Sequence, residues 1–144
     1  MNQFAKPNIN LPVSLNDAII TSIKQRPSTS CEIDGYICFK FADGYYIVNE
    51  NEVEQTGEAY VTLSGVDFDF SHVYYCKENK REEITFNQLA EDVEKNTLEV
   101  IDETYGYNQT KFSCNVMTEN DWYEVEIKIY HFNQTKYEWE DNPV

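Results

Sequence analysis

Alternation of apolar and polar residues is the feature that most limits what this chain can fold into. Successive side chains of a β-strand point to opposite faces, so a strand with one buried face reads apolar, polar, apolar. The chain shows this pattern near position 37 and again on both sides of a turn at 118–121. It predicts antiparallel strands with one face in the core and one in water. The expected inward residues are Ile33, Gly35, Ile37, Phe39, Phe41, Phe112, Cys114, Val116, Val125, Ile127 and Ile129.

Turn signals divide this strand material into a meander and a separate hairpin. Asp43-Gly44 is a strong two-residue hairpin signal between the strand ending at Phe41 and a second strand at Tyr45–Asn49. Further strands are expected at Ala59–Leu63 and Phe68–Lys77, and the hairpin centred on 118–121 comes last. The sequence therefore predicts about five to six antiparallel strands.

Two segments carry helix signals. Ser14 is a good N-cap, and the apolar spacing that follows predicts a short helix over Leu15–Lys24. Thr85 is a second N-cap with Gln88 in the capping-box position, and apolar residues then recur every three or four positions. The segment 97–104 fits either the end of this helix or a strand, and both alternatives stay open.

These elements predict a single α+β domain spanning residues 1–144. We expect a short N-terminal helix and an antiparallel sheet, made of a four-strand meander and the C-terminal hairpin, packed on one longer helix. Residues 1–13 are expected to be an extended lead-in, since Pro7 and Pro12 oppose helix. Residues 137–144 are acidic and aromatic and are expected to be a mobile tail.

The net charge of −15 narrows the classes of partner. Residues 1–40 hold four basic and three acidic residues, whereas residues 41–144 hold seven basic and 23 acidic residues. A surface of this sign disfavours direct binding to nucleic acid or to an anionic membrane. It suits a basic protein as partner, because opposite charges speed the encounter of two proteins.

The acidic residues recur at every second position, most regularly at Glu50, Glu52 and Glu54. In an extended strand these three side chains would share one face at a spacing of about 6.6 Å. Tyr45 would tie this row into the sheet, and further acids would extend it into a broad acidic face. The candidate partner-binding residues are Glu50, Glu52, Glu54, Tyr45, Glu99, Asp102, Glu103, Glu124 and Glu126.

Signs of catalysis or of a cofactor are weak. Asp67 and Asp69 flank one apolar residue and resemble the acidic strand of nucleotidyltransferases, in which paired carboxylates hold divalent metal. That family also has a Gly-Ser turn on a helix several residues upstream, whereas Ser64-Gly65 here abuts the pair directly. The two residues are therefore only a weak metal candidate. We expect no enzyme activity and no cofactor.

The four cysteines and two histidines lack the spacing of a zinc site. No basic and apolar leader opens the sequence, and no apolar run approaches 18 residues. We therefore expect a cytoplasmic protein with reduced thiols. His72 and His131 fall within strand patterns and are expected to be hydrogen-bonded sheet residues.

In composition the chain resembles phage-encoded DNA mimics, anti-CRISPR proteins and immunity proteins against nuclease toxins. This resemblance implies a small acidic inhibitor that engages a basic surface of a nucleic-acid-handling protein, such as a nuclease, toxin or defence effector. Exposed tyrosines would supply its contact energy. The alternative is a structural or accessory protein of a phage or mobile element, whose acidic surface only keeps it soluble.

Overall fold

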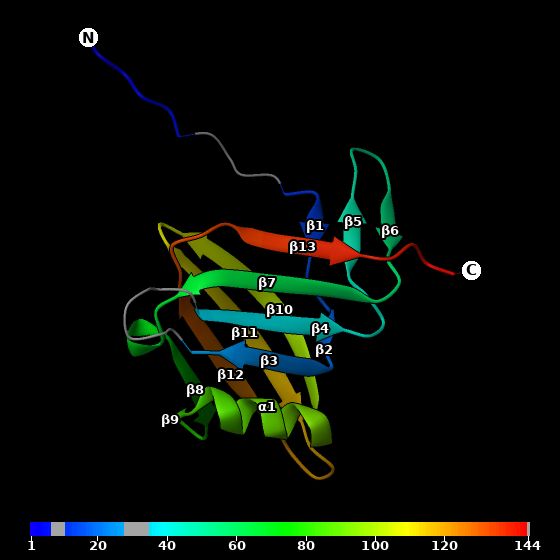
Figure 1. Cartoon of the computed structure of the whole chain (residues 1–144), viewed down its shortest axis with the longest axis vertical. Helices are drawn as coiled ribbons and strands as arrows, with labels where there is room; N and C mark the ends of the chain where they lie inside the picture. The colour runs from blue at the N-terminus through cyan, green and yellow to red at the C-terminus, as the bar shows by residue number, and fades with distance from the viewer. Residues whose placement is uncertain (7–10, 28–34, 144) are drawn as a thin grey trace.

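Two antiparallel sheets, packed face to face, form the body of the protein (Figure 1). The computed structural model describes residues 1–6, 11–27 and 35–143. In chain order its elements are β1 (Val13–Ser14), β2 (Ile19–Ile20), β3 (Ser22–Arg26), β4 (Gly35–Phe41), β5 (Tyr46–Val48), β6 (Val53–Gln55), β7 (Ala59–Val66), a 3₁₀ turn η1 (Phe68–Phe70), β8 (His72–Lys77), β9 (Lys80–Ile84), α1 (Phe86–Lys95), β10 (Thr97–Gly106), β11 (Gln109–Met117), β12 (Trp122–Tyr130) and β13 (Thr135–Trp139).

The strand order places most of the described strands in two large sheets and the others in a small third one. One large sheet has six strands in the order β2-β10-β11-β12-β8-β9, and the other has four in the order β13-β7-β4-β3. Strands β1, β5 and β6 form the small sheet, which stands beside one end of the four-stranded sheet in Figure 1. The described strand pairs are antiparallel.

Alternate side chains of both large sheets fill the space between them. Strand β4 alternates buried and partly exposed residues along its whole length, and the inward prediction for it is confirmed from Gly35 to Phe41. Ile33 lies outside the described residues. The rings of Phe39 and Phe112 meet edge to face across the two sheets, with centroids 5.3 Å apart. The predicted inward residues of the C-terminal hairpin are confirmed as buried: Phe112, Cys114, Val116, Val125, Ile127 and Ile129.

The predicted helix over Leu15–Lys24 is wrong, because the chain makes a tight turn and two short strands there. Asp17 has a φ of 66°, which a right-handed helix excludes, and the N–H of Ala18 donates to the carbonyl of Leu15 at 2.9 Å. The following residues, Ile-Ile-Thr-Ser-Ile, are rich in β-branched side chains, which favour strands. Here β2 pairs with β10, and β3 pairs with β4.

The predicted helix after Thr85 is confirmed in its first half. The Thr85 hydroxyl accepts the N–H of Gln88 at 3.0 Å, and α1 then runs for 10 residues with Phe86, Leu89 and Val93 buried. The open question about 97–104 is resolved as strand, since β10 begins at Thr97. Along this strand Leu98 and Val100 are fully or almost fully buried, as expected for alternation rather than for a helical stripe.

The α+β prediction is therefore wrong as a fold class. The protein is mostly β, with 57% of its described residues in strands and 10% helical, and α1 is the one α-helix among these residues. Two further boundaries differ from expectation: Phe68–Phe70 form η1 instead of the start of a strand, and Tyr137–Trp139 belong to β13 rather than to a mobile tail. Within the described ranges, no helix is long and apolar enough to cross a membrane.

Helix α1 and strand β13 lie on opposite sides of the two packed sheets. The helix contacts β3, an edge of the four-stranded sheet, and β8 of the six-stranded sheet (Figure 1). Strand β13 is the other edge of the four-stranded sheet and lies next to β10, because the hydroxyls of Tyr105 and Tyr137 are 2.7 Å apart. One side of the sandwich is thus closed by a helix, and the other by side chains of two strand edges.

Truncating Phe112 tests this inter-sheet packing. We expect Phe112→Ala to lower the free energy of unfolding by about 3–5 kcal/mol, because the cavity would lie between the sheets opposite Phe39. The matched control is Phe70→Ala on η1, where the ring is 68% exposed and the expected change is within about 0.5 kcal/mol. Denaturant unfolding measures the free energy of unfolding of both variants and of the wild type. Equal losses in the two variants would contradict the packing of Phe112 between the sheets.

Candidate functional site

The predicted row of Glu50, Glu52 and Glu54 is a hairpin rather than one extended strand. The chain reverses between β5 and β6, where the N–H of Asn49 donates to the carbonyl of Glu52 at 2.9 Å. Glu50 and Glu52 lie in this turn and Glu54 lies on β6, opposite Ile47. The regular 6.6 Å spacing expected for one strand is therefore absent. All three carboxylates are nevertheless exposed.

Hydrogen bonds to main-chain carbonyls hold further acidic segments beside this hairpin. The side-chain amide of Gln55 donates to the carbonyl of Asp43 at 2.9 Å, which attaches the β4–β5 turn. The N–H of Gly57 donates to the carbonyl of Glu140 at 2.8 Å, which attaches the segment after β13. We call the resulting group the acidic hairpin surface. It consists of Asp43, Glu50, Glu52, Glu54, Glu58, Glu138, Glu140 and Asp141.

Few cations neutralise the acidic hairpin surface. Among the described residues, ion pairs reach two of its eight carboxylates: Lys40 is 3.7 Å from Glu58 and Lys136 is 3.6 Å from Glu138. The hydroxyl of Tyr60 also donates to Glu58, which lowers the pKa of that carboxyl, and the same bond raises the pKa of Tyr60 to about 12. Glu58 therefore stays ionised well below neutral pH.

Tyr45, predicted as a partner contact, is instead fully buried beneath this surface. Its ring meets those of Phe41, Tyr137 and Trp139 edge to face. Its hydroxyl donates towards the carbonyl of Glu138 at 3.0 Å, and burial raises its pKa. Tyr45 therefore anchors the base of the hairpin to β13 from inside, and its side chain is not accessible at the surface.

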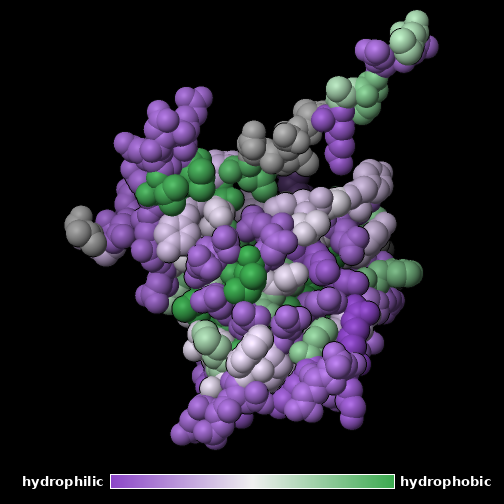
Figure 2. Space-filling model, turned by 180° about the vertical axis from the view of Figure 1, so that it is seen from behind, coloured by the Kyte–Doolittle hydropathy of each residue, from purple (hydrophilic) through white to green (hydrophobic). Residues whose placement is uncertain are grey.

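Exposed apolar side chains accompany the carboxylates of the hairpin. Val53 is 65% exposed, Trp139 43% and Val48 40%, all on or next to the acidic hairpin surface. Seen from behind, a hydrophilic projection at the upper left stands above a strongly hydrophobic patch (Figure 2). The surface thus combines charge with apolar area, as protein interfaces do.

A second group of predicted residues lies on the outer face of the six-stranded sheet, which faces the viewer in Figure 2. Asn115 on β11 lies between Glu99 of β10 and Glu124 of β12 and pairs with both. Ser113 on β11 lies in the same way between Asp102 and Glu126. The four acids Glu99, Asp102, Glu124 and Glu126 therefore share one face, as predicted for a common surface.

This outer face is mixed in charge rather than acidic throughout. Glu126 pairs with Arg81 at 2.9 Å and with Lys111 at 3.8 Å. The guanidinium of Arg81 also stacks 3.7 Å from the centroid of Tyr74, and Lys128 lies 5.7 Å from the same ring. The sequence reasoning missed this basic and aromatic cluster, because it joins β8, β9, β11 and β12 only through the strand register.

Glu103 points inward, away from the other predicted acids of β10. A β-bulge between Val100 and Asp102 shifts the alternation by one residue, so Glu103 falls on the core side of the sheet. One carboxylate oxygen accepts the N–H of Leu15 at 2.7 Å, and the other accepts the hydroxyl of Tyr105 at 3.0 Å. Glu103 thus holds the N-terminal turn against β10.

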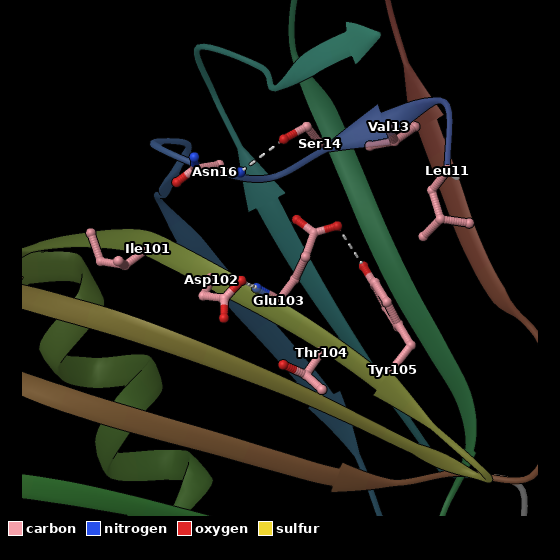
Figure 3. A pocket seen from close by; sticks show the side chains of 9 residues that line it. All are labelled: Leu11, Val13, Ser14, Asn16, Ile101, Asp102, Glu103, Thr104 and Tyr105. Carbon is pink, nitrogen blue, oxygen red and sulfur yellow. Dashed lines mark hydrogen bonds between the residues drawn. The ribbon is translucent and has the colours of Figure 1, made fainter. Parts of the chain in front are cut away.

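A pocket of about 470 Å³ opens beside Glu103, between β10 and the segment around β1 (Figure 3). Burial raises the pKa of the Glu103 carboxyl, and the hydrogen bonds from Leu15 and Tyr105 oppose this effect. In Figure 3, Glu103 and Tyr105 project from the same side of β10 towards β1, and Asp102 and Thr104 project from the other. The residues that line the pocket are Leu11, Val13, Ser14, Asn16, Ile101, Asp102, Glu103, Thr104 and Tyr105.

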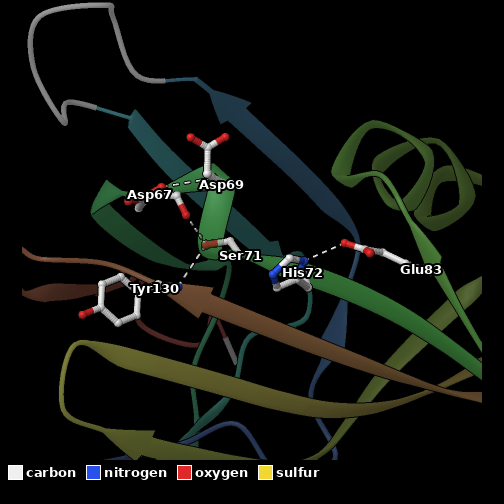
Figure 4. A network of polar contacts seen from close by, with 6 residues as sticks. All are labelled: Asp67, Asp69, Ser71, His72, Glu83 and Tyr130. Atoms are coloured by element: carbon white, nitrogen blue, oxygen red, sulfur yellow. Dashed lines mark hydrogen bonds and ion pairs between the residues drawn. The ribbon is translucent and has the colours of Figure 1, made fainter.

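Asp67 and Asp69, the weak metal candidate, lie at the start of η1, where the Asp67 side chain has a local structural role. The Asp67 side chain caps η1 by accepting the N–H of Asp69 at 3.1 Å, and the Asp69 carboxylate projects away from it (Figure 4). The Asp67 carbonyl accepts the hydroxyl of Ser71 at 2.7 Å, and that hydroxyl oxygen accepts the N–H of Tyr130. The described part of the chain contains no group of three or more His, Cys, Asp or Glu side chains suited to a metal ion.

Both histidines make the sheet hydrogen bonds that the sequence predicted. His72 lies 2.6 Å from a carboxylate oxygen of Glu83 on the neighbouring strand (Figure 4). His131 is buried between the hydroxyl of Thr110 at 2.7 Å and the carbonyl of Asn133 at 2.9 Å. Each imidazole therefore has a structural partner.

The buried position of Glu103 predicts a pH-dependent difference in stability from Glu103→Gln. A carboxyl whose pKa is raised in the folded state favours folding while protonated, so the wild type loses stability as pH rises from about 4.5 through the folded pKa. The amide stays neutral and can still accept from Leu15 while donating to Tyr105. We expect the variant to gain stability relative to the wild type across that window and to keep the gain at higher pH.

Denaturant unfolding at several pH values between 4 and 8 measures this difference. Glu54→Gln on the exposed hairpin is the matched control, and its difference from the wild type should not follow the same curve. A Glu103→Gln difference that is constant with pH, or that falls as pH rises, would contradict the buried carboxylate.

The structure therefore separates the predicted site residues into three places. Glu50, Glu52 and Glu54 lie on the acidic hairpin surface with Tyr45 beneath them. Four more acids share the outer face of the six-stranded sheet, and Glu103 lies in the pocket between β10 and β1. Compared with known proteins, the chain matches no family model, no curated protein and no solved structure.

Proposed function

We propose that this chain is a cytoplasmic binding protein, not an enzyme, that engages a basic surface of a nucleic-acid-handling protein through its acidic hairpin surface. The observation that carries the proposal is the projecting β5–β6 hairpin, which exposes three carboxylates beside five more from neighbouring segments. The free thiols of Cys38, Cys76 and Cys114 support a reducing compartment.

Electrostatics support a fast and selective encounter with a basic partner. The eight carboxylates of the surface face two nearby lysines, Lys40 and Lys136, so its local field is strongly negative. Such a field steers an oppositely charged protein and can raise its association rate by 10- to 1,000-fold. The effect is screened by salt, with a Debye length of about 8 Å at physiological ionic strength.

Apolar side chains support a stable complex once the encounter has occurred. Charged groups alone set encounter and register, whereas buried aromatic and aliphatic groups supply most of the contact energy. Val53, Val48 and Trp139 are exposed at the hairpin and can be covered by a partner. Because Tyr45 fixes the base of the hairpin in the core, little order would have to be gained on binding.

A nucleic-acid-binding groove is the kind of basic surface that these features fit best. Such grooves are lined with Lys and Arg that normally contact phosphates. Carboxylates on a narrow, projecting hairpin can enter a groove and occupy those cations, and nucleic acid would then compete for the same site. The chain would act as an inhibitor of a nuclease, a toxin or a defence effector.

Reversing the charge of the hairpin tests this function. With the wild-type chain as bait, we expect a pull-down at low salt to return a basic, nucleic-acid-binding protein, and we expect added DNA or RNA to displace it. The triple variant Glu50→Lys/Glu52→Lys/Glu54→Lys should then bind the purified partner at least about tenfold more slowly at low salt. Surface-based kinetic measurements at several salt concentrations give this rate.

The control reverses three acids at the opposite end of the molecule, Glu91→Lys/Glu94→Lys/Glu119→Lys, on α1 and the β11–β12 turn. It changes the net charge equally, so a purely global charge effect would slow both variants alike. Unchanged association of the hairpin variant, or capture that nucleic acid does not displace, would overturn the proposal. It would favour a structural protein whose acidic surface only keeps it soluble.

A further inference from the structure

Strand β10 has an edge that its neighbours leave open. On one side it pairs with β11 along its whole length, but on the other side β2 covers only Leu98 and Glu99. Val100 is then bonded to the N-terminal turn, donating to the carbonyl of Ala18 and accepting the N–H of Asp17, both at 2.8 Å. Beyond that point, residues 101–106 have no strand partner on this side among the described residues.

The strand register shows which main-chain groups face the open side. The two-residue turn at Tyr107-Asn108 is closed by the pair of Gly106 and Gln109, which in such hairpins exchange hydrogen bonds. Main-chain groups alternate sides along a strand, so those of Gly106 and Thr104 point to β11. Those of Glu103 and Tyr105 therefore point to the open side.

One of these groups already has a local partner. The N–H of Glu103 donates to the side chain of Asp102 at 2.9 Å. The carbonyl of Glu103 and both main-chain groups of Tyr105 remain directed at the open side, where no strand of the described residues pairs with them. Exposed donors and acceptors of this kind are the template on which an additional strand can pair.

The open edge lies along the pocket of about 470 Å³ described above. The opposite wall comes from the segment around β1, where Leu11 is 39% exposed and Val13 also lines the pocket. Figure 3 shows this segment running above β10, with Glu103 and Tyr105 projecting into the space between them. The edge is therefore bordered by a groove with an apolar wall.

We propose that this groove is a β-augmentation site that accepts an extended, basic segment of the partner as an added strand on β10. The main-chain edge suits an extended peptide, and the exposed Asp102 carboxylate on the outer face suits a cation. Side chains of the added strand would alternate, with apolar residues facing Leu11 and Val13 and basic residues facing Asp102. The basic character of the segment rests on the proposed function.

A short peptide, acetyl-Lys-Val-Lys-Val-Lys-amide, is the probe. Its five residues span about 17 Å at about 3.3 Å per residue, enough to pair with residues 102–106 of the open edge. Added to the full-length chain, it should shift the amide NMR signals of Glu103 and Tyr105. Asp102→Asn should weaken its binding about two- to fivefold, the range of a partly exposed ion pair.

Two N-methylated forms of the same peptide separate strand pairing from simple attraction of charge. Residues opposite Glu103 and Tyr105 direct their N–H groups at β10, and in the proposed register these are the valines. Methylation of both valine nitrogens should therefore lower the affinity at least about tenfold, because it removes donors and adds a steric clash. The backbone N–H groups of the lysines face solvent. Methylation of two of these backbone nitrogens should therefore leave the affinity within about twofold of the parent peptide.

Each outcome distinguishes this inference from the proposed function. Equal binding of the two methylated forms, or no shift at Glu103 and Tyr105, would overturn β-augmentation. If the shifts appeared only at Glu50, Glu52 and Glu54, the hairpin would still bind basic partners and only the groove would be excluded. The hairpin variant Glu50→Lys/Glu52→Lys/Glu54→Lys should retain the shift at Tyr105, whatever becomes of its binding to the captured partner.

Discussion

The structure depends on the burial of alternate side chains between two antiparallel sheets. Phe39 and Phe112 meet across this interface, and the inward residues of the central strands are fully or almost fully buried around them. Because every second residue of these strands must be apolar, most of the large surplus of acid falls on turns, strand edges, outer faces and the exposed side of α1, with Glu103 as an exception. The position of the carboxylates on the surface is thus a consequence of how the core is filled.

The two sides of the sandwich are closed in different ways, and in our proposal this difference determines where a partner binds. Helix α1 covers one side with its apolar face. On the other side, a series of hydrogen bonds joins the N-terminal turn, β10 and β13. It runs from Leu15 through Glu103 and Tyr105 to Tyr137. Among the described residues, no strand pairs with residues 101–106 of β10 on this side. Tyr45, buried beside Tyr137, extends the same side to the base of the acidic hairpin.

Most strands and the first half of the helix after Thr85 could be predicted, because each depends on a local pattern: alternation or a capping hydroxyl. The hairpin predicted at Asp43-Gly44, and with it the four-strand meander, is wrong, because β4 pairs with β3 and β7 whereas β5 pairs with β1 and β6 in another sheet. The segment after Ser14 could not, because its apolar spacing also fits a helix, and only the positive φ of Asp17 and pairing with β10 exclude it. Glu103 was misplaced for a related reason, since a β-bulge moves it to the core side. Glu50 and Glu54 are exposed as expected, but the turn that separates them was not predicted.

Hydrogen–deuterium exchange of the chain, alone and in complex with the basic partner it captures, tests the central claim most directly. Amide exchange is slowed where a partner covers or orders the main chain. We predict slower exchange over residues 46–57 and 138–141, with the exposed face of α1 unchanged. Protection confined to α1 or to the β11–β12 turn, with unchanged exchange over the β5–β6 hairpin, would contradict the account.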